Sequence, residues 1–197
     1  MQDSNTTPNS LERFEPPGGI LIWIIVFLEL VTFGAGFVVL VMQGREHAEV
    51  FKAGRALLNQ PVALANTLIL LTGGWCMACG ITALRRGDGA KIASKWICGA
   101  IVTGIAFLVL KGIEYMEKIQ HGIGLSHDAF FTIYYLLTGF HFLHVLVAVA
   151  LLIYMRSAII RRKYDRLNHQ DVESSSVFWH MCDLIWLLLY PLIYLIL

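Results

Sequence analysis

The sequence predicts an all-α, polytopic membrane protein with five transmembrane helices in one bundle. Hydrophobic residues make up 57% of the 197 residues and charged residues 15%, whereas about a quarter of the residues in a soluble domain are charged. The mean hydropathy of +0.65 exceeds what one compact soluble core of this length could bury. Five segments each offer the roughly 20 apolar residues that a helix needs to cross a bilayer. A water-soluble enzyme is therefore excluded.

The chain divides into a polar leader, residues 1–18, and a five-helix transmembrane domain, residues 19–197. The apolar run after the leader is too long for a cleaved signal peptide, so we expect it to remain as the first membrane helix. Short connections containing Gly, Arg, Lys and Pro separate the spans, so consecutive helices should be antiparallel neighbours. The expected spans are 19–42, 61–84, 96–115, 129–155 and 177–197.

Lysine and arginine are distributed unevenly between the two ends of these spans. Ten lie in the leader and in the second and fourth connections, and five lie at the opposite ends. Because positive charge favours the cytoplasmic side, we expect the N-terminus inside and the C-terminus outside. The ten are Arg13, Arg85, Arg86, Lys91, Lys95, Arg156, Arg161, Arg162, Lys163 and Arg166; the five are Arg45, Lys52, Arg55, Lys111 and Lys118.

The net charge argues against a nucleic-acid-binding protein, and the placement of the cysteines argues against a redox or zinc site. A net charge of +1 leaves no basic surface of the kind that binding to nucleic acid needs. The four cysteines all lie in apolar runs, where they behave as small hydrophobic residues. Cys76 and Cys79 match a CxxC pattern only formally, because burial in an apolar helix disfavours the thiolate that redox and zinc chemistry require.

Polar residues in the first two spans are costly in a membrane and are therefore candidate functional residues. Glu29 lies near the middle of the first span. It is expected either to be protonated and bonded to a neighbouring helix, or to act in a proton relay or at a substrate. In the second span Asn66 can bridge helices, and the small residues Gly73 and Gly74 allow close helix packing.

The third span ends in Lys111, Glu114 and Tyr115. Lys111 and Glu114 are three residues apart, which allows an ion pair at the membrane interface. Since long charged side chains extend to the interface without any further role, an interfacial anchor is expected here.

The fourth and fifth spans each carry a polar stripe, and we expect the two stripes to face each other. His141 and His144 lie on one side of the fourth, and His180, Asp183 and Trp186 follow one another at intervals of three on the fifth. Such a set could bind a metal, bind haem, or form a hydrogen-bonded network. We expect the network, because buried polar groups in lipid must find partners. Glu173, seven residues before His180, is expected to continue it at the cytoplasmic end.

These residues lie within longer blocks that resemble subunit III of the haem-copper oxidases, in its five-helix form. The blocks are FLELVTFGAGF, ALANTLILLTGG, KGIEY, FFTIYYLLTGFHFLHVLVA and ESSSVFWHMCDLIWLLLYPLIYL. They cover all five spans in order. The family's polar residues correspond to Glu29, Asn66, Glu114, His141, His144, Glu173, His180, Asp183 and Trp186. Ala148, Met181 and Cys182 depart from the family pattern without removing a polar group.

The resemblance implies a subunit with no catalytic residue and no cofactor or metal of its own. Haem and metal would belong to a catalytic haem-containing partner subunit, and membrane lipids, including a bound phospholipid, would be further partners. The resemblance also implies support of assembly, stability or sustained turnover, in the inner membrane of a bacterium. In longer members the first two helices form one wall of a cleft that binds lipid, and the resemblance to the five-helix form implies a chain without that wall.

Within the family, the chain looks most like the NorE-type accessory protein of bacterial nitric oxide reductase, which acts in denitrification. The alternative is subunit III of a bacterial quinol or cytochrome c oxidase. Two hypotheses come from other functional classes. One is a b-type membrane cytochrome that uses His141 or His144 with His180. The other is a proton-linked transporter that uses Glu29 and Asp183.

Overall fold

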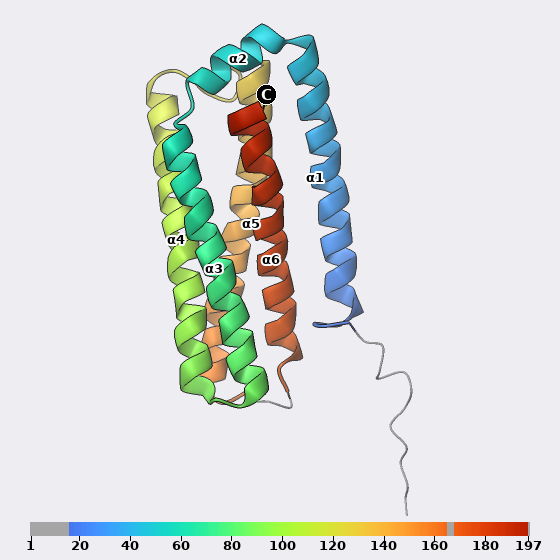
Figure 1. Ribbon diagram of the computed structural model, residues 1–197, viewed down its shortest axis with the longest axis vertical. Helices are drawn as coiled ribbons and strands as arrows, with labels where there is room; N and C mark the ends of the chain where they lie inside the picture. Colours follow the sequence, from blue (N-terminus) through green and yellow to red (C-terminus); the bar gives the residue numbers. More distant parts are fainter. Residues whose placement is uncertain (1–15, 165–167, 197) are drawn as a thin grey trace, which may run out of the picture.

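A computed structural model describes residues 16–164 and 168–196 (Figure 1). Six α-helices and one π-helical turn make up these ranges, and no strand occurs within them. Most of the leader, with Arg13, and Arg166 fall outside the described residues. The elements are α1 (Ile20–Glu46), α2 (Ala48–Ala56), α3 (Gln60–Arg86), α4 (Ala90–Gln120), α5 (Ala129–Ile160), α6 (Gln170–Pro191) and η2 (Leu192–Ile196).

Five of these helices are long and apolar enough to cross a membrane: α1, α3, α4, α5 and α6 with η2. The five spans expected from the sequence are thus present, but the helices extend beyond them. The helix α4 runs past both ends of the expected span 96–115, and α6 begins before residue 177. Hydropathy marks only the part of a helix that faces lipid, whereas backbone hydrogen bonds continue into the polar interface.

Local sequence explains where the long helices start and stop. Asn59 accepts a hydrogen bond from the Val62 backbone N–H at 3.2 Å and caps α3, and Asp128 does the same for α5 through Phe131 at 2.8 Å. Gly87 ends α3 in the left-handed conformation, with φ of 77°. These are standard signals for helix starts and ends.

The short helix α2 was not expected from the sequence. It crosses the end of the bundle between α1 and α3 (Figure 1). Phe51 is buried against Phe130 of α5, with ring centroids 5.3 Å apart, and Gly54 packs against the same ring. With only nine residues and an amphipathic pattern, α2 is too short and too polar to register as a span.

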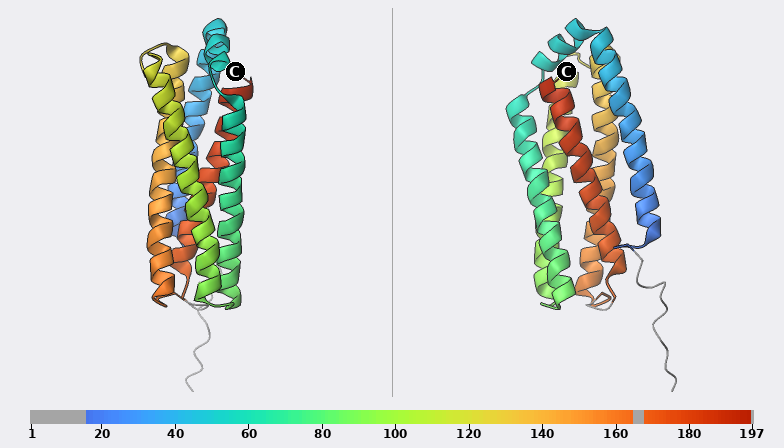
Figure 2. Two further views of the ribbon diagram at one scale, coloured as in Figure 1. Left: turned by 90° about the vertical axis from the view of Figure 1, so that its left-hand side faces the viewer. Right: turned by 45° about the vertical axis from the view of Figure 1, so that its right-hand side comes forward.

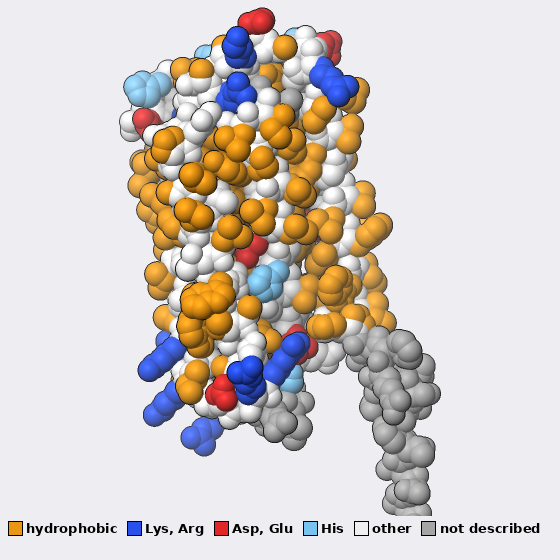
Figure 3. Space-filling model, in the orientation of Figure 1, with side chains coloured by type: hydrophobic (Ala, Val, Ile, Leu, Met, Phe, Trp, Pro, Cys, Tyr) orange, Lys and Arg blue, Asp and Glu red, His pale blue; other side chains and the backbone are white. Residues whose placement is uncertain are grey.

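The helices pack as an antiparallel bundle, with α1 along its side against α5 and α6 (Figures 1 and 2). The start of α1, the α3–α4 connection, the end of α5 and the start of α6 lie at one end. The helix α2, the α4–α5 connection and η2 lie at the other (Figure 1). Figure 3 shows mostly hydrophobic side chains over the middle of the molecule, with an acidic and a histidine side chain visible among them, and charged side chains gathered towards the two ends, as expected for a membrane-spanning bundle.

The Trp179 side chain of α6 determines how closely α6 packs against α3 and α4. Its indole lies between Gly73 of α3 and Gly104 of α4, where an added Cβ would come within 2.8 Å and 2.7 Å of the ring. Only glycine therefore leaves room for this side chain, and the expectation that Gly73 serves close helix packing is confirmed.

Candidate functional site

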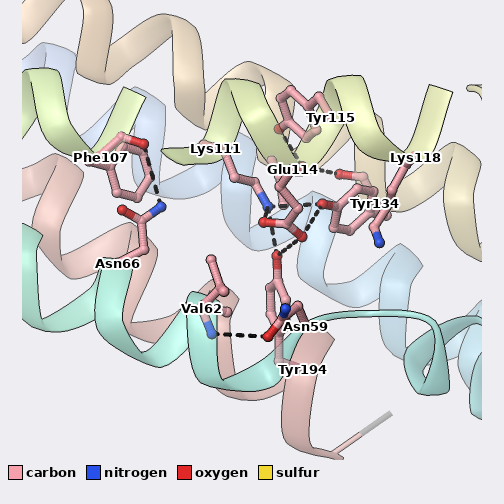
Figure 4. Close-up of polar contacts among 12 residues, drawn as sticks. Asn59, Val62, Asn66, Phe107, Lys111, Glu114, Tyr115, Lys118, Tyr134 and Tyr194 are labelled. Atoms are coloured by element: carbon pink, nitrogen blue, oxygen red, sulfur yellow. Dashed lines mark hydrogen bonds and ion pairs between the residues drawn. The ribbon is translucent and has the colours of Figure 1, made fainter. Parts of the chain in front are cut away.

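A buried polar cluster lies at the α2 end of the bundle (Figure 4). Lys111 is 1% exposed and Glu114 5% exposed, and their Nζ and Oε2 atoms lie 3.1 Å apart. Lys111 donates to the hydroxyl oxygens of Tyr134 at 2.9 Å and Tyr194 at 2.6 Å. Both tyrosines donate in turn to Glu114 Oε1, at 2.7 Å and 2.9 Å.

The expectation of an interfacial anchor at Lys111 and Glu114 is wrong. The two side chains point into the bundle, where Tyr134 of α5 and Tyr194 of η2 lie against them (Figure 4). Charged groups leave water only when they are paired and hydrogen-bonded. Two opposite charges and two hydroxyls meet that condition together.

Sequence reasoning missed Tyr194. It lies in the final apolar stretch, where a tyrosine looks like a membrane-interface residue. Side chains of α2 and α3 also bind the η2 turn that contains Tyr194. Arg55 donates a hydrogen bond to the Leu195 carbonyl at 2.9 Å, and Gln60 donates one to the Tyr194 carbonyl at 3.0 Å. A Lys–Glu pair inside the bundle needs further hydrogen-bonding groups around it, and tyrosines in other spans can supply them. This requirement is the signal that could have pointed to Tyr194.

A second polar contact joins α1 to α5. Glu29 Oε2 lies 3.2 Å from His144 Nε2. His144 Nδ1 lies 2.8 Å from the Phe140 carbonyl oxygen, and because a carbonyl only accepts, Nδ1 carries hydrogen. Nε2 is the ring nitrogen that faces Glu29, whose Oε2 atom has no hydrogen-bond partner in the described part of the chain.

His141 takes no part in the expected network. Its ring is fully buried, and neither ring nitrogen has a hydrogen-bond partner among residues 16–164 and 168–196. It stacks on Trp186 with centroids 5.2 Å apart and meets the Phe107 ring edge-on at 5.7 Å. Trp186 instead donates from Nε1 to Thr67 Oγ1 of α3 at 2.9 Å.

Asp183 and His180 are paired with each other on α6, with Oδ2 and Nδ1 3.6 Å apart. Asp183 faces Gly74 of α3 rather than the histidines of α5. Its Oδ1 atom has no hydrogen-bond partner in the described part of the chain. Asn66, also on α3, donates to the Phe107 carbonyl at 3.4 Å.

Glu173 lies near one end of the bundle, away from His180. It forms an ion pair with Arg85 of α3 at 2.7 Å and contacts His169 at 3.0 Å. The single chain of hydrogen bonds expected to run from Glu173 through His180 and Asp183 to His141 is thus divided into separate contacts. Helical spacing gives the correct faces, but α3 rather than α5 lies opposite Asp183.

Within the described ranges, no group of three or more His, Cys, Asp or Glu side chains is arranged to hold a metal ion. The contacts that the polar residues do make are charge pairs and hydrogen bonds. Several of these contacts join elements that are distant in sequence, whereas Lys111–Glu114 and His180–Asp183 are pairs within one helix.

Comparisons with known proteins agree with the resemblance seen in the sequence. A family model described as cytochrome c oxidase subunit III matches residues 21–196. Cytochrome c oxidase subunit 3 of Corynebacterium diphtheriae is 27% identical over 96% of this chain and 94% of its own length. Cytochrome bo(3) ubiquinol oxidase subunit 3 of Pseudomonas aeruginosa is 28% identical over 99% and 94%. The heme-copper oxidase subunit I+III of Aeropyrum pernix is 27% identical over 89% of this chain, which spans 22% of that longer protein.

Proposed function

The chain belongs to the cytochrome c oxidase subunit III family, and on that premise we propose that it is a non-catalytic membrane subunit of a respiratory haem-copper oxidase. The observation that carries the proposal is the match over residues 21–196, which includes nearly all of the five candidate spans. Its role is to support the assembly, stability or sustained turnover of the complex.

The polar contacts inside the bundle support a structural role. Lys111, Glu114 and the tyrosine hydroxyls around them satisfy one another. Both ring nitrogens of His144 face groups of this same chain. A haem iron would need one of these nitrogens free. The ring nitrogens of His141 have no partner among the described residues, but that fully buried ring is packed against Trp186 and Phe107. We therefore propose that haem and metal reside in the partner subunit, and that this chain binds neither.

The partner in this proposal is the catalytic haem-containing subunit. The name of the Aeropyrum relative joins subunits I and III in one protein, which supports a stable association of this kind. Membrane lipids would surround the remaining surface. We place the complex in the bacterial inner membrane, with the N-terminus inside and the C-terminus outside, because positive side chains concentrate at the N-terminal end of the bundle.

The sequence blocks alone favour the accessory protein of nitric oxide reductase. We propose an oxidase subunit instead. The relatives described above are named as subunits of cytochrome c, ubiquinol or heme-copper oxidases. The choice between cytochrome c and quinol as electron donor follows from the catalytic partner rather than from this chain.

Purification of the complex through this chain tests the proposal. An affinity tag at the N-terminus, mild detergent and mass spectrometry would identify the partner. The partner fraction should carry the haem spectrum and consume oxygen with quinol or reduced cytochrome c. Nitric oxide consumption without oxygen consumption would assign the chain to nitric oxide reductase. A haem absorption band in the isolated chain would instead favour a b-type cytochrome.

A further inference from the structure

One histidine in the middle of the membrane-spanning helices points out of the bundle. The His180 side chain is 45% exposed, whereas His144 is largely covered and His141 is fully buried. His180 lies in the middle third of the 27-residue span Gln170–Ile196. Ionisable side chains at this depth almost always face the interior of a bundle or a water-filled cavity. The outward position of His180 therefore requires a covering group that this chain does not supply.

Asp183 and Gly74 determine which way the imidazole points. Nδ1 of His180 faces Asp183 Oδ2 at 3.6 Å. The two side chains lie over Gly74 of α3, where an added Cβ would clash with the carboxylate and come within 3.6 Å of Nδ1. No residue in the described part of the chain bonds to the other ring nitrogen, Nε2. This nitrogen is left for a group from another molecule.

A large aromatic side chain is exposed at the same depth. Trp75 follows Gly74, is 60% exposed, and meets Trp96 of α4 edge-on with ring centroids 5.2 Å apart. Tryptophan in membrane proteins is enriched at the two membrane–water interfaces, but Trp75 lies in the middle third of α3. Tryptophan is also enriched among the residues that contribute most to protein–protein binding. Trp75 thus favours a protein on this face.

Apolar side chains extend the surface along both helices. On α6, Leu184 and Leu187 follow His180 at intervals of four and seven, so the three lie on one side of the helix. On α3, Leu68 and Leu71 precede Trp75 at intervals of seven and four. All four leucines are exposed. Because His180 lies over Gly74, the two stripes lie side by side and form one surface, which we call the α3–α6 face.

The polarity of His180 distinguishes a protein from a lipid as the covering group. Acyl chains offer no hydrogen bond, and lipid headgroups lie at the membrane surfaces rather than at this depth. A transmembrane helix can bring a polar side chain to the middle of the membrane and bond it across the interface. A hydroxyl or an amide both donates and accepts, so either group can bond to Nε2 whether or not Nε2 carries a hydrogen.

On the premise of the function proposed above, we propose that the α3–α6 face binds a transmembrane helix of the catalytic subunit. That helix places a hydroxyl or amide side chain against His180 Nε2 and packs its apolar side chains against Trp75 and Leu187. Asp183 occupies Nδ1 from within the chain and leaves Nε2 for the partner. The imidazole therefore leaves the lipid when the complex assembles.

Photocrosslinking in the intact complex tests the surface. The photoreactive amino acid p-benzoylphenylalanine replaces Trp75 or Leu187 in the full chain, and mass spectrometry identifies the crosslinked peptides. The matched control position is Leu143, which is exposed near the middle of α5. We expect Trp75 and Leu187 to crosslink to a membrane-spanning segment of the catalytic subunit, and Leu143 to crosslink to lipid.

The outcomes separate this proposal from the proposed function. If the haem-containing subunit crosslinks to Leu143 alone, the α3–α6 face is the wrong surface and the proposed function stands. If Trp75 and Leu187 crosslink only to a protein without haem, the catalytic subunit is the wrong partner for this face. Crosslinks to lipid alone at all three positions would also overturn the proposal.

Variants of His180 test the hydrogen bond. His180→Phe keeps a ring but removes both nitrogens, and it should weaken the binding of the catalytic subunit in detergent about 3- to 10-fold, the effect of one hydrogen bond between membrane helices. His180→Gln keeps a polar group and should bind nearly as tightly as wild type. Equal losses in the two variants would show that ring packing, rather than Nε2, holds the partner.

A measurement on the wild-type complex guards against misfolded variants. Diethyl pyrocarbonate modifies accessible histidines, and His127, at the end of the bundle, has a side chain exposed to almost the same extent as that of His180, at 43%. We expect His127 to be modified in the intact complex, and His180 to be modified only after the catalytic subunit has been removed. Equal modification of the two residues in the intact complex would overturn the proposal.

Discussion

Lys111 Nζ and Tyr194 Oη lie 2.6 Å apart, although 83 positions separate the two residues in the sequence. The contact joins the interior of α4 to the π-helical turn that ends the described chain. It also brings one hydroxyl to both members of the Lys111–Glu114 ion pair. The last turn is therefore held by a buried charge pair as well as by apolar packing.

The first prediction concerns the Tyr194 hydroxyl. Tyr194→Phe removes one acceptor of Lys111 and one donor of Glu114, and we expect a loss of about 1–3 kcal/mol in stability, the cost of leaving buried polar atoms unpaired. Thermal unfolding in detergent measures it. Tyr154→Phe is the control, because Tyr154 is exposed on α5 and its removal should change stability by less than about 0.5 kcal/mol. Equal midpoints for Tyr194→Phe and wild type would contradict the prediction.

The second prediction tests whether the charges of Lys111 and Glu114 depend on each other for stability. Lys111→Met leaves Glu114 buried without its cation and should cost about 3–5 kcal/mol. The double variant Lys111→Met/Glu114→Gln removes both charges and should recover much of that loss. A double-mutant cycle, built from unfolding measured in detergent, gives the coupling free energy between the two charges. Additive losses would mean that the two charges do not depend on each other.

The third prediction tests the packing of Trp179. Gly104→Ala places a Cβ 2.6 Å from Val149 Cγ2 and 2.7 Å from the Trp179 ring, so it should destabilise the bundle by about 1–3 kcal/mol through overpacking. Gly112→Ala lies on the same helix, where an added Cβ meets nothing within 4 Å, and it should be neutral or stabilising. A Gly104→Ala protein as stable as Gly112→Ala would show that the helices have room to separate.

The fourth prediction concerns topology. Single cysteines at Arg161 and at His127, introduced after replacement of the four native cysteines, lie at opposite ends of the bundle. The positive-inside rule predicts that His127→Cys reacts with an impermeant reagent in intact cells, and that Arg161→Cys reacts only after permeabilisation. The reverse labelling pattern would invert the proposed orientation.

The fifth prediction follows from Asp183, which packs against Gly74 of α3. Asp183→Leu adds a branched apolar side chain at this close contact and should lower the amount of chain recovered with its partner subunit. Initial turnover per assembled complex should change little. The shape-conserving variant Asp183→Asn should assemble normally. If Asp183→Asn assembled but lost turnover by orders of magnitude, Asp183 would have a direct part in the reaction.

The sequence alone determined the number and order of the spans, because the cost of placing a polar backbone in lipid acts on each segment separately. The blocks around Glu29, His141 and Trp179 were also enough to indicate the family. Spacing on α6 correctly placed His180 beside Asp183, since contacts within one helix depend on local geometry.

Only the tertiary structure decided which polar residues meet. Lys111 and Glu114 look like an interfacial pair until Tyr134 and Tyr194 arrive from distant segments and make their burial possible. The same holds for Asp183, whose neighbour is a glycine of α3 rather than a histidine of α5. The physical reason is that hydropathy and helical period are properties of one segment, whereas the partner of a buried charge is set by how the helices pack against one another.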